Sequence, residues 1–202
     1  MDGSTLRASL STCTDYLDGL PADAWSTDVP FMARTVTGTV LHIAQCLLWY
    51  SVDLSAGAPE LPTVEVQVKT DVPPTDALRT LTTATRLAAA AVDAAAPDAR
   101  GWHPAGLADA SGFAAMACDE LLVHTGDIAT ALNVPFQPPD ALAEATLRRL
   151  FPWAPAAVAP WPGLLWANDR TDLPDRPRPG SGWVWHCAPL SEWDGEVPVW
   201  AG

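Results

Sequence analysis

Apolar residues recur every three or four positions in several parts of the chain, which is the spacing of one face of an α-helix. Long stretches of this kind predict four helices, over about residues 5–20, 34–54, 76–96 and 111–132. A fifth, shorter helix is expected over about 139–150. The second helix is apolar on nearly all sides, so we expect it to lie at the centre of the fold. Long helices joined by loops predict an all-α helical bundle.

Capping residues predict where these helices begin. Ser4 and Thr75 are expected N-caps, because a side-chain oxygen at this position accepts a hydrogen bond from a free backbone N–H. Ser111 is expected to open the fourth helix. Pro21 and Pro97 are expected to end the first and third, since proline cannot continue a helix.

Prolines mark two stretches outside the helices. Residues 58–74 hold four prolines and an alternating run, Val64 to Val68, which predicts an extended crossover that could include one edge strand. Seven of the ten tryptophans lie beyond Phe151, where a short helix at about 163–168 and a hairpin-like stretch at 183–186 are expected. We therefore predict a bundle over residues 1–155 and a Trp/Pro-rich extension, 156–202, that packs on it.

Composition and charge exclude several classes of protein. The chain has 202 residues, 49% of them hydrophobic and 17% charged, as in a globular protein. A net charge of -13 with only 11 Lys and Arg repels phosphate backbones and anionic lipids, so neither nucleic acid nor a membrane surface is an expected partner. The sequence shows neither a signal peptide nor a transmembrane run, and its four cysteines form no Cys-x-x-Cys pair. We expect a cytoplasmic protein with free, buried thiols.

The fourth predicted helix carries ionisable groups on an inward-facing stripe. Glu120 and His124 lie one turn apart, about 40° around the helix, and Asp127 falls on the same stripe. Such groups are costly to bury unless something pairs with them, and a divalent cation does this well. His42 is the candidate third ligand, because it alone of the other histidines lies within a central apolar helix. Two histidines and one carboxylate, with a position left open, predict a catalytic metal site.

Other interpretations of these residues stay open at this point. Glu and His at this spacing are also common as a surface pair or as a satisfied core histidine. In a metal-free bundle, His42 and Glu120 would instead hydrogen-bond to each other.

Four more residues are candidates for weaker roles. Asp127 is expected to orient a ligating histidine, and it is a catalytic candidate together with His103. His103 could contact substrate or anchor its loop. Arg170 is a candidate cofactor-binding residue, and Arg148 a weaker anion binder; solvation at the surface is the ordinary role of both.

Two segments resemble a known family. Thr-Val-Leu-His-Ile-Ala-Gln at 39–45 and Glu-Leu-Leu-Val-His-Thr-Gly-Asp at 120–127 resemble the DinB-like metalloenzyme superfamily, and within it the N-terminal domain of mycothiol-dependent maleylpyruvate isomerase. Segments 100–106 and 150–153 are also similar to that group, and the resemblance covers about residues 5–155.

The resemblance implies a four-helix bundle with an open metal site, in which His42, Glu120 and His124 bind zinc or another divalent metal. It implies a low-molecular-weight thiol (mycothiol, bacillithiol or glutathione) as co-substrate, and a homodimer as one expectation. The hypothesis is a zinc-dependent enzyme of the thiol-transferase or isomerase type that acts on a small electrophilic or unsaturated substrate. The alternative is a non-catalytic protein that binds or sequesters a small molecule in the same pocket.

Overall fold

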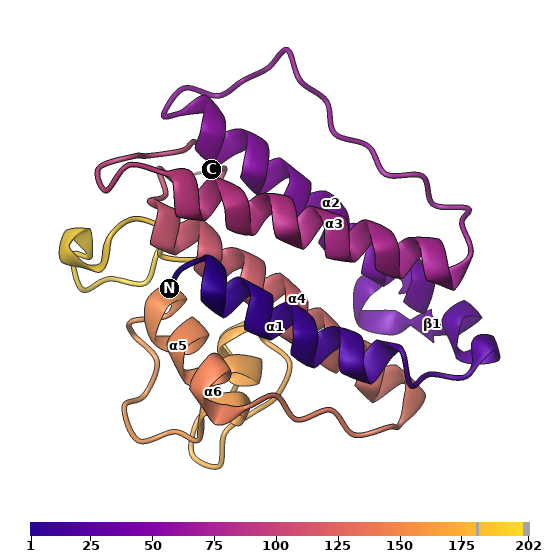
Figure 1. The fold of residues 1–202 in the computed structure, drawn as a ribbon. Helices are drawn as coiled ribbons and strands as arrows, with labels where there is room; N and C mark the ends of the chain where they lie inside the picture. Colours follow the sequence, from indigo (N-terminus) through magenta and orange to yellow (C-terminus); the bar gives the residue numbers. More distant parts are fainter. Residues whose placement is uncertain (181, 200–202) are drawn as a thin grey trace.

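Four long helices lie alongside one another in a bundle, as Figure 1 shows. The structure is a computed structural model and describes residues 1–180 and 182–199. Its α-helices are α1 (Gly3–Leu17), α2 (Val36–Ala56), α3 (Pro74–Ala94), α4 (Ala110–Leu132), α5 (Asp140–Leu150) and α6 (Pro160–Ala167). The prediction of an all-α bundle is therefore confirmed.

Short elements connect the long helices. Between α1 and α2, the strands β1 (Asp28–Val29) and β2 (Arg34–Thr35) pair antiparallel around a 3-10 helix at Pro30–Met32. Two further 3-10 helices span Ala22–Ser26 and Leu190–Glu192. No helix among the described residues is both long enough and apolar enough to pass through a membrane.

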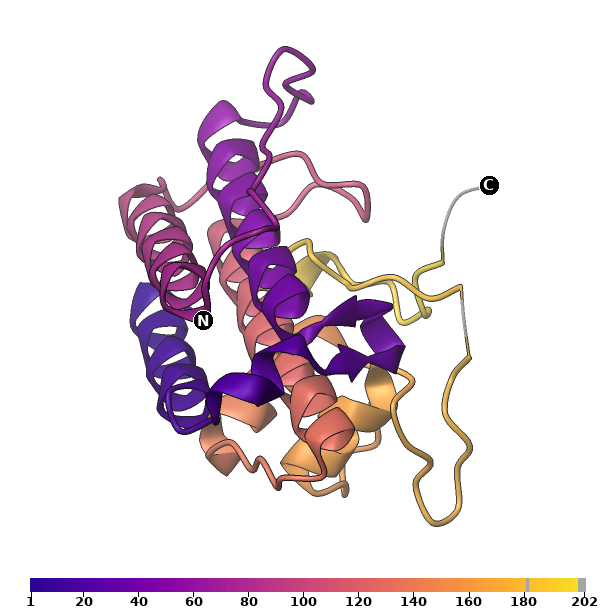
Figure 2. The ribbon, with the colours of Figure 1, turned by 90° about the vertical axis from the view of Figure 1, so that its right-hand side faces the viewer.

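The core of the bundle is centred on α4. This helix contacts α1, α2, α3 and α5, and it is buried along nearly its whole length. Figure 2 shows α1 and α3 on one side of α2 and α4, with the chain that follows α6 on the other side. Helix α2, which was expected to be central, has several half-buried positions, among them His42, Cys46 and Trp49. One face of α2 is therefore left partly open, and the candidate site lies on that face.

Four helix starts differ from the predicted ones. Helix α2 begins at Val36, because Arg34 and Thr35 form strand β2. Asp2, not Ser4, caps α1: its Oδ1 accepts a hydrogen bond from the Thr5 amide at 3.0 Å. The carboxylate of Asp2, two residues before Ser4, is a stronger acceptor than a hydroxyl. Helix α3 begins at Pro74 rather than after Thr75, which is possible because the first turn of a helix needs no N–H partner there. Asp109 caps α4, one position before its first residue.

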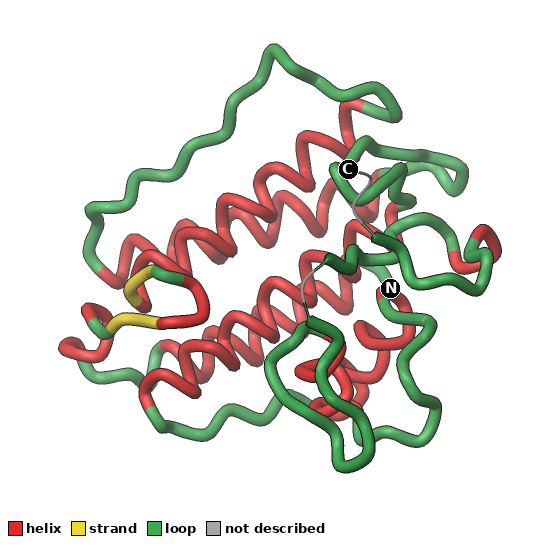
Figure 3. Tube along the Cα trace, turned by 180° about the vertical axis from the view of Figure 1, so that it is seen from behind, coloured by secondary structure: helices red, strands yellow, loops and turns green. Residues whose placement is uncertain are grey.

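The crossover between α2 and α3 contains no strand. Residues 64–68, expected to form an edge strand, are part of the long loop that Figure 3 shows in green. An edge strand needs a neighbouring strand, and here the Val68 amide donates instead to the Gln45 side chain at 3.4 Å. The beginning of this loop forms one wall of the cavity described below.

The chain after α5 is fixed to the bundle by polar contacts. Asp119 of α4 accepts hydrogen bonds from Asn168 at 2.9 Å and from the Trp185 indole at 3.2 Å. Helix α6 begins three residues before the predicted 163–168 helix. The hairpin expected at 183–186 is instead a single bridge between Trp183 and Val199. The division into a bundle and an extension stays a prediction.

Candidate metal centre

The three predicted ligands come together between α2 and α4. One ligand atom each from His42, Glu120 and His124 lie within 4.8 Å of one another. Glu120 and His124 follow each other by one turn of α4, and His42 faces them from α2. The His42 side chain is 28% exposed, whereas that of Glu120 is 7% exposed, so the group is open on the His42 side.

One oxygen of the Glu120 carboxylate accepts a hydrogen bond and the other does not. The Tyr50 hydroxyl donates a hydrogen bond to Oε1 at 3.0 Å. Oε2 is buried, and no described residue donates a hydrogen bond to it. It lies 3.0 Å from His124 Nε2 and 3.8 Å from His42 Nε2, but outside the direction in which a ring N–H of His124 would donate. A buried carboxylate oxygen without a well-aligned donor is costly, so either a proton on His124 or a cation held between the three ligand atoms would stabilise it.

The spacing of these atoms fits a divalent metal ion. In tetrahedral coordination with bonds of about 2.0 Å, neighbouring ligand atoms lie about 3.3 Å apart, and the two observed distances fall on either side of this value. The 3.8 Å between His42 and Glu120 is too long for a hydrogen bond. The hydrogen-bonded pair expected of a metal-free bundle is therefore not formed by these residues.

Asp127 sets the proton position on His124. Its Oδ2 lies 2.9 Å from His124 Nδ1, and because a carboxylate can only accept, Nδ1 carries the hydrogen. Nε2 is then the ring nitrogen left to bind a metal ion or a second proton. Burial lowers the pKa of His124, but its hydrogen bonds and the nearby carboxylates of Asp127 and Glu120 raise it to about 9. A proton and a metal ion therefore compete for Nε2 at neutral pH.

Arg170 holds Asp127 from the other side. Its Nε and Nη2 donate to Oδ1 at 3.1 Å and to Oδ2 at 2.8 Å, and its guanidinium lies 4.5 Å from the centre of the Phe31 ring. The structure thus places Arg170 against a carboxylate rather than free to bind an anion. Arg148 lies in the last turn of α5, where it pairs with Glu144. It also donates hydrogen bonds to the carbonyls of residues 154–156, which follow this helix.

His103 lies in the loop before α4 and belongs to an aromatic cluster. Its Nδ1 accepts a hydrogen bond from the Ala105 amide at 3.1 Å, so its hydrogen is on Nε2. Its ring lies 5.6 Å from that of Tyr50 and 5.9 Å from that of Trp185. Burial lowers the pKa of His103 to about 4, and it is neutral at pH 7. These contacts fit the loop-anchoring role, and the ring also lines the cavity beside the metal centre.

That cavity has a volume of about 510 Å³ and lies next to the metal centre, because two residues of its wall, Cys46 and Tyr50, contact the candidate ligands. Cys46 Sγ lies 3.7 Å from His42 Nε2, and Tyr50 contacts Glu120. The cavity is lined by Cys46, Trp49, Tyr50, Asp53, Glu60, Leu61, Pro62, Val64, Trp102, His103 and Pro104.

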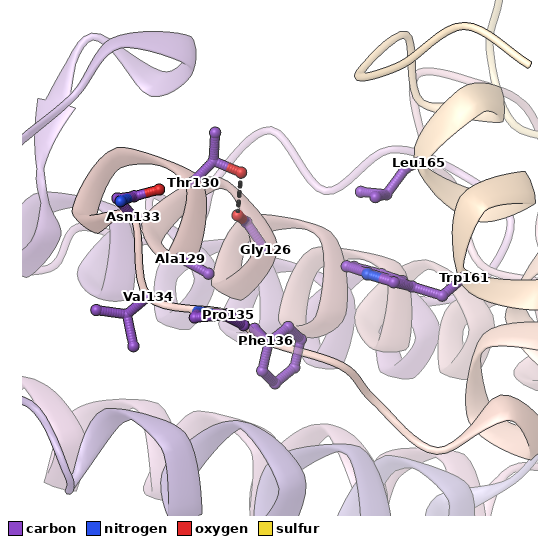
Figure 4. Close-up of a pocket in the computed structure, with 9 residues that line it drawn as sticks. All are labelled: Gly126, Ala129, Thr130, Asn133, Val134, Pro135, Phe136, Trp161 and Leu165. Carbon is purple, nitrogen blue, oxygen red and sulfur yellow. Dashed lines mark hydrogen bonds between the residues drawn. The ribbon is translucent and has the colours of Figure 1, made fainter.

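A second cavity, shown in Figure 4, lies at the end of α4 and has a volume of about 340 Å³. The described residues that line it, including Gly126, Phe136 and Trp161, have no titratable side chain. Acid–base or metal chemistry there has no group to perform it. A further cavity of about 600 Å³ is lined in part by Asp127 and Arg170, which are engaged with each other. The cavity beside the metal centre is the candidate substrate pocket, because Tyr50 and Cys46 in its wall contact the candidate ligands.

The sequence analysis missed Tyr50 and Cys46 as members of the site. Both follow His42 on α2, by eight and four residues, and therefore face the same side of the helix. That spacing is a usable signal, but in a helix apolar on nearly all sides it does not stand out.

We expect Asp127→Asn to bind zinc about 10 to 100 times more weakly than the wild type, because the amide no longer fixes the His124 ring by a charged hydrogen bond. Competition with a chromophoric chelator measures this affinity. Arg170→Gln is the matched control: it removes the Asp127 ion pair but keeps the His124 contact, so a smaller loss is expected. Equal affinity in the wild type and Asp127→Asn would contradict the orienting role.

Comparison with known proteins gives one match. The family model described as the mycothiol maleylpyruvate isomerase N-terminal domain matches residues 6–129, which include α2, α3, most of α1 and α4, and all three candidate ligands. Searches of curated proteins and of solved structures gave no significant match. Since the family model covers more than half of the chain, the protein belongs to the mycothiol maleylpyruvate isomerase N-terminal domain family, within the DinB-like superfamily.

Proposed function

We propose that this protein is a zinc-dependent enzyme of the thiol-transferase or isomerase type that uses a low-molecular-weight thiol such as mycothiol. Its substrate is a small electrophilic or unsaturated metabolite, and it acts in the cytoplasm, where such thiols are kept reduced. The observation that carries the proposal is Glu120 Oε2, a buried acceptor without a hydrogen bond beside two histidine nitrogens. The family supports the choice of thiol.

His42, Glu120 and His124 would hold the metal ion. A zinc ion with three protein ligands lowers the pKa of a thiol bound at its open position and so supplies the thiolate nucleophile. The remaining roles belong to side chains of this chain. Asp127 keeps the Nε2 lone pair of His124 directed at the site, and Tyr50 keeps the Glu120 carboxylate in place.

The cavity walls would bind and orient the substrate. Trp49 and Trp102 offer apolar surfaces that exclude water, and neutral His103 has its Nε2–H free for donation to a substrate oxygen. A suitable acceptor for the His103 Nε2–H is the oxygen of a carbonyl group that lies next to a double bond or a leaving group. This oxygen gains negative charge when a thiolate attacks the substrate.

Calorimetry with mycothiol, on zinc-loaded and metal-stripped protein, tests the proposal. We expect at least tenfold tighter binding to the zinc-loaded form, with release of a proton because the thiol is bound as a thiolate. Maleylpyruvate, an uncharged enone and an aryl halide are then offered as test electrophiles, with and without mycothiol.

The outcomes separate enzyme from binding protein. Turnover that needs both zinc and thiol supports the enzyme, and thiol binding without turnover of any electrophile favours the sequestering alternative. Equal thiol affinity with and without zinc would overturn the proposed role of the metal.

A further inference from the structure

Asp53 is a largely buried residue whose carboxylate opens onto the cavity beside the metal centre, and this carboxylate has no partner among the described residues. Only 7% of its surface is exposed, and no described side chain or amide forms a hydrogen bond or ion pair with its carboxylate. Burial, and then the charge of Glu60, raise the pKa of Asp53 to about 6. It is therefore mostly ionised at neutral pH, and a carboxylate on the wall of a partly enclosed cavity is stabilised when a cation pairs with it.

The surroundings of Asp53 are suited to a cation. It lines the cavity beside the metal centre, where Glu60 supplies a second carboxylate and Trp49, Tyr50 and Trp102 supply aromatic rings. No Lys or Arg is present among the described residues that line this cavity. Carboxylates combined with aromatic rings bind ammonium groups, because the ring faces also attract positive charge.

The position of Asp53 connects it to the metal centre. It follows His42 by eleven residues, or about three turns of α2, and lies only about 20° away around the helix. Cys46 and Tyr50 lie between them and line the same cavity. A ligand whose reacting atom lies at the metal centre therefore extends along this face of α2 toward Asp53.

We propose that this end of the cavity binds a cationic group of the ligand, an amine or quaternary ammonium, with Asp53 as its counter-ion and Glu60 as a weaker, outer one. The inference rests on the proposed function in one respect, namely that the reacting atom of the ligand lies at the metal centre. Its consequence is a preference in substrate charge: cationic ligands are favoured, and dicarboxylates are repelled by two like charges.

Choline and 3,3-dimethylbutan-1-ol are the probes that test this inference, because they have the same shape and differ in the positive charge. Binding to the full chain is measured by calorimetry and by the change in tryptophan fluorescence. We expect the wild type to bind choline about ten times more tightly than the alcohol. In Asp53→Asn the choline affinity falls about tenfold, to the level of the alcohol, while binding of the alcohol is unchanged.

Two further variants complete the design. Asp15→Asn removes one negative charge from the exposed surface of α1, outside the cavity, and is expected to leave the choline preference unchanged. Glu60→Gln alters an exposed residue, so it keeps the fold and should lower choline affinity by a factor of about two to three. It tests the proposal even if Asp53→Asn does not fold.

Equal affinities of the wild type for the two probes, an unchanged ratio in Asp53→Asn, or no saturable binding of choline would overturn the inference. The same titration in His124→Ala separates it from the proposed function. A choline preference that persists in a variant without metal shows that Asp53 acts independently of the metal centre. Loss of metal from His124→Ala without a change in the choline preference therefore tests the proposed enzyme activity and not the role of Asp53.

Discussion

Purified, untagged protein is expected to carry about one equivalent of zinc or another divalent metal, and its His124→Ala variant essentially none. The variant removes the nitrogen that lies 3.0 Å from Glu120 Oε2, and so leaves a single histidine with one carboxylate. Two ligands on a partly open site hold zinc far more weakly than three. Elemental analysis after dialysis measures the metal content directly.

His103→Ala is the matched control for this experiment. It makes the same substitution at a histidine whose Nδ1 is already engaged by the Ala105 amide, outside the three-ligand group. We expect it to retain the metal. Circular dichroism establishes that both variants are folded. Absence of metal from the wild type and from His124→Ala, even after zinc has been added, would overturn the metal centre.

The parts of the fold that follow from local spacing could be predicted from the sequence. Glu120 and His124 lie one turn apart on a single helix, so their proximity depends only on helix geometry. His42 could be paired with them because it is a histidine inside an apolar helix, where an imidazole needs a partner. The long helices likewise follow from an apolar repeat that neighbouring turns share.

Contacts between distant segments could not be predicted in this way. Tyr50 reaches Glu120 across 70 residues of sequence, and Arg170 reaches Asp127 across 43. Each depends on how the helices and the chain after α5 pack, and no local pattern carries that information. Asp53 illustrates the same limit: in sequence it is one polar residue near a helix end, and only the fold places it on the wall of a cavity, without a partner among the described residues.

The structure of residues 183–186 also could not be predicted from the local sequence pattern. Residues 183–186 have the alternation of a strand, but a strand forms only where another segment offers its backbone. Here the His186 amide donates to the carbonyl of Leu150, and Trp183 bridges to Val199. The polar side chains of α4 and α5, rather than a β-sheet ladder, fix this segment.

Arg149 provides the main polar link between the bundle and this segment, and we expect Arg149→Met to lower the free energy of unfolding by about 3 kcal/mol. Its guanidinium is buried: it pairs with Asp109, the cap of α4, and donates to the carbonyls of His186 and Cys187 at 3.0 and 3.1 Å. Methionine fills much of the same volume but leaves these three acceptors without their donors. For a chain of this length, such a loss lowers Tm by roughly 9 °C.

The neighbouring Arg148→Met is a matched control, because it removes the same group from the same helix at a more exposed position. The Arg148 side chain is 30% exposed and that of Arg149 7%, so water can replace more of the hydrogen bonds of Arg148. We expect a loss of about 1 kcal/mol or less. Thermal unfolding of the two variants, followed by tryptophan fluorescence, measures the difference. Equal destabilisation would contradict the prediction that the buried contacts of Arg149 with the 186–187 backbone add more to stability than the exposed contacts of Arg148.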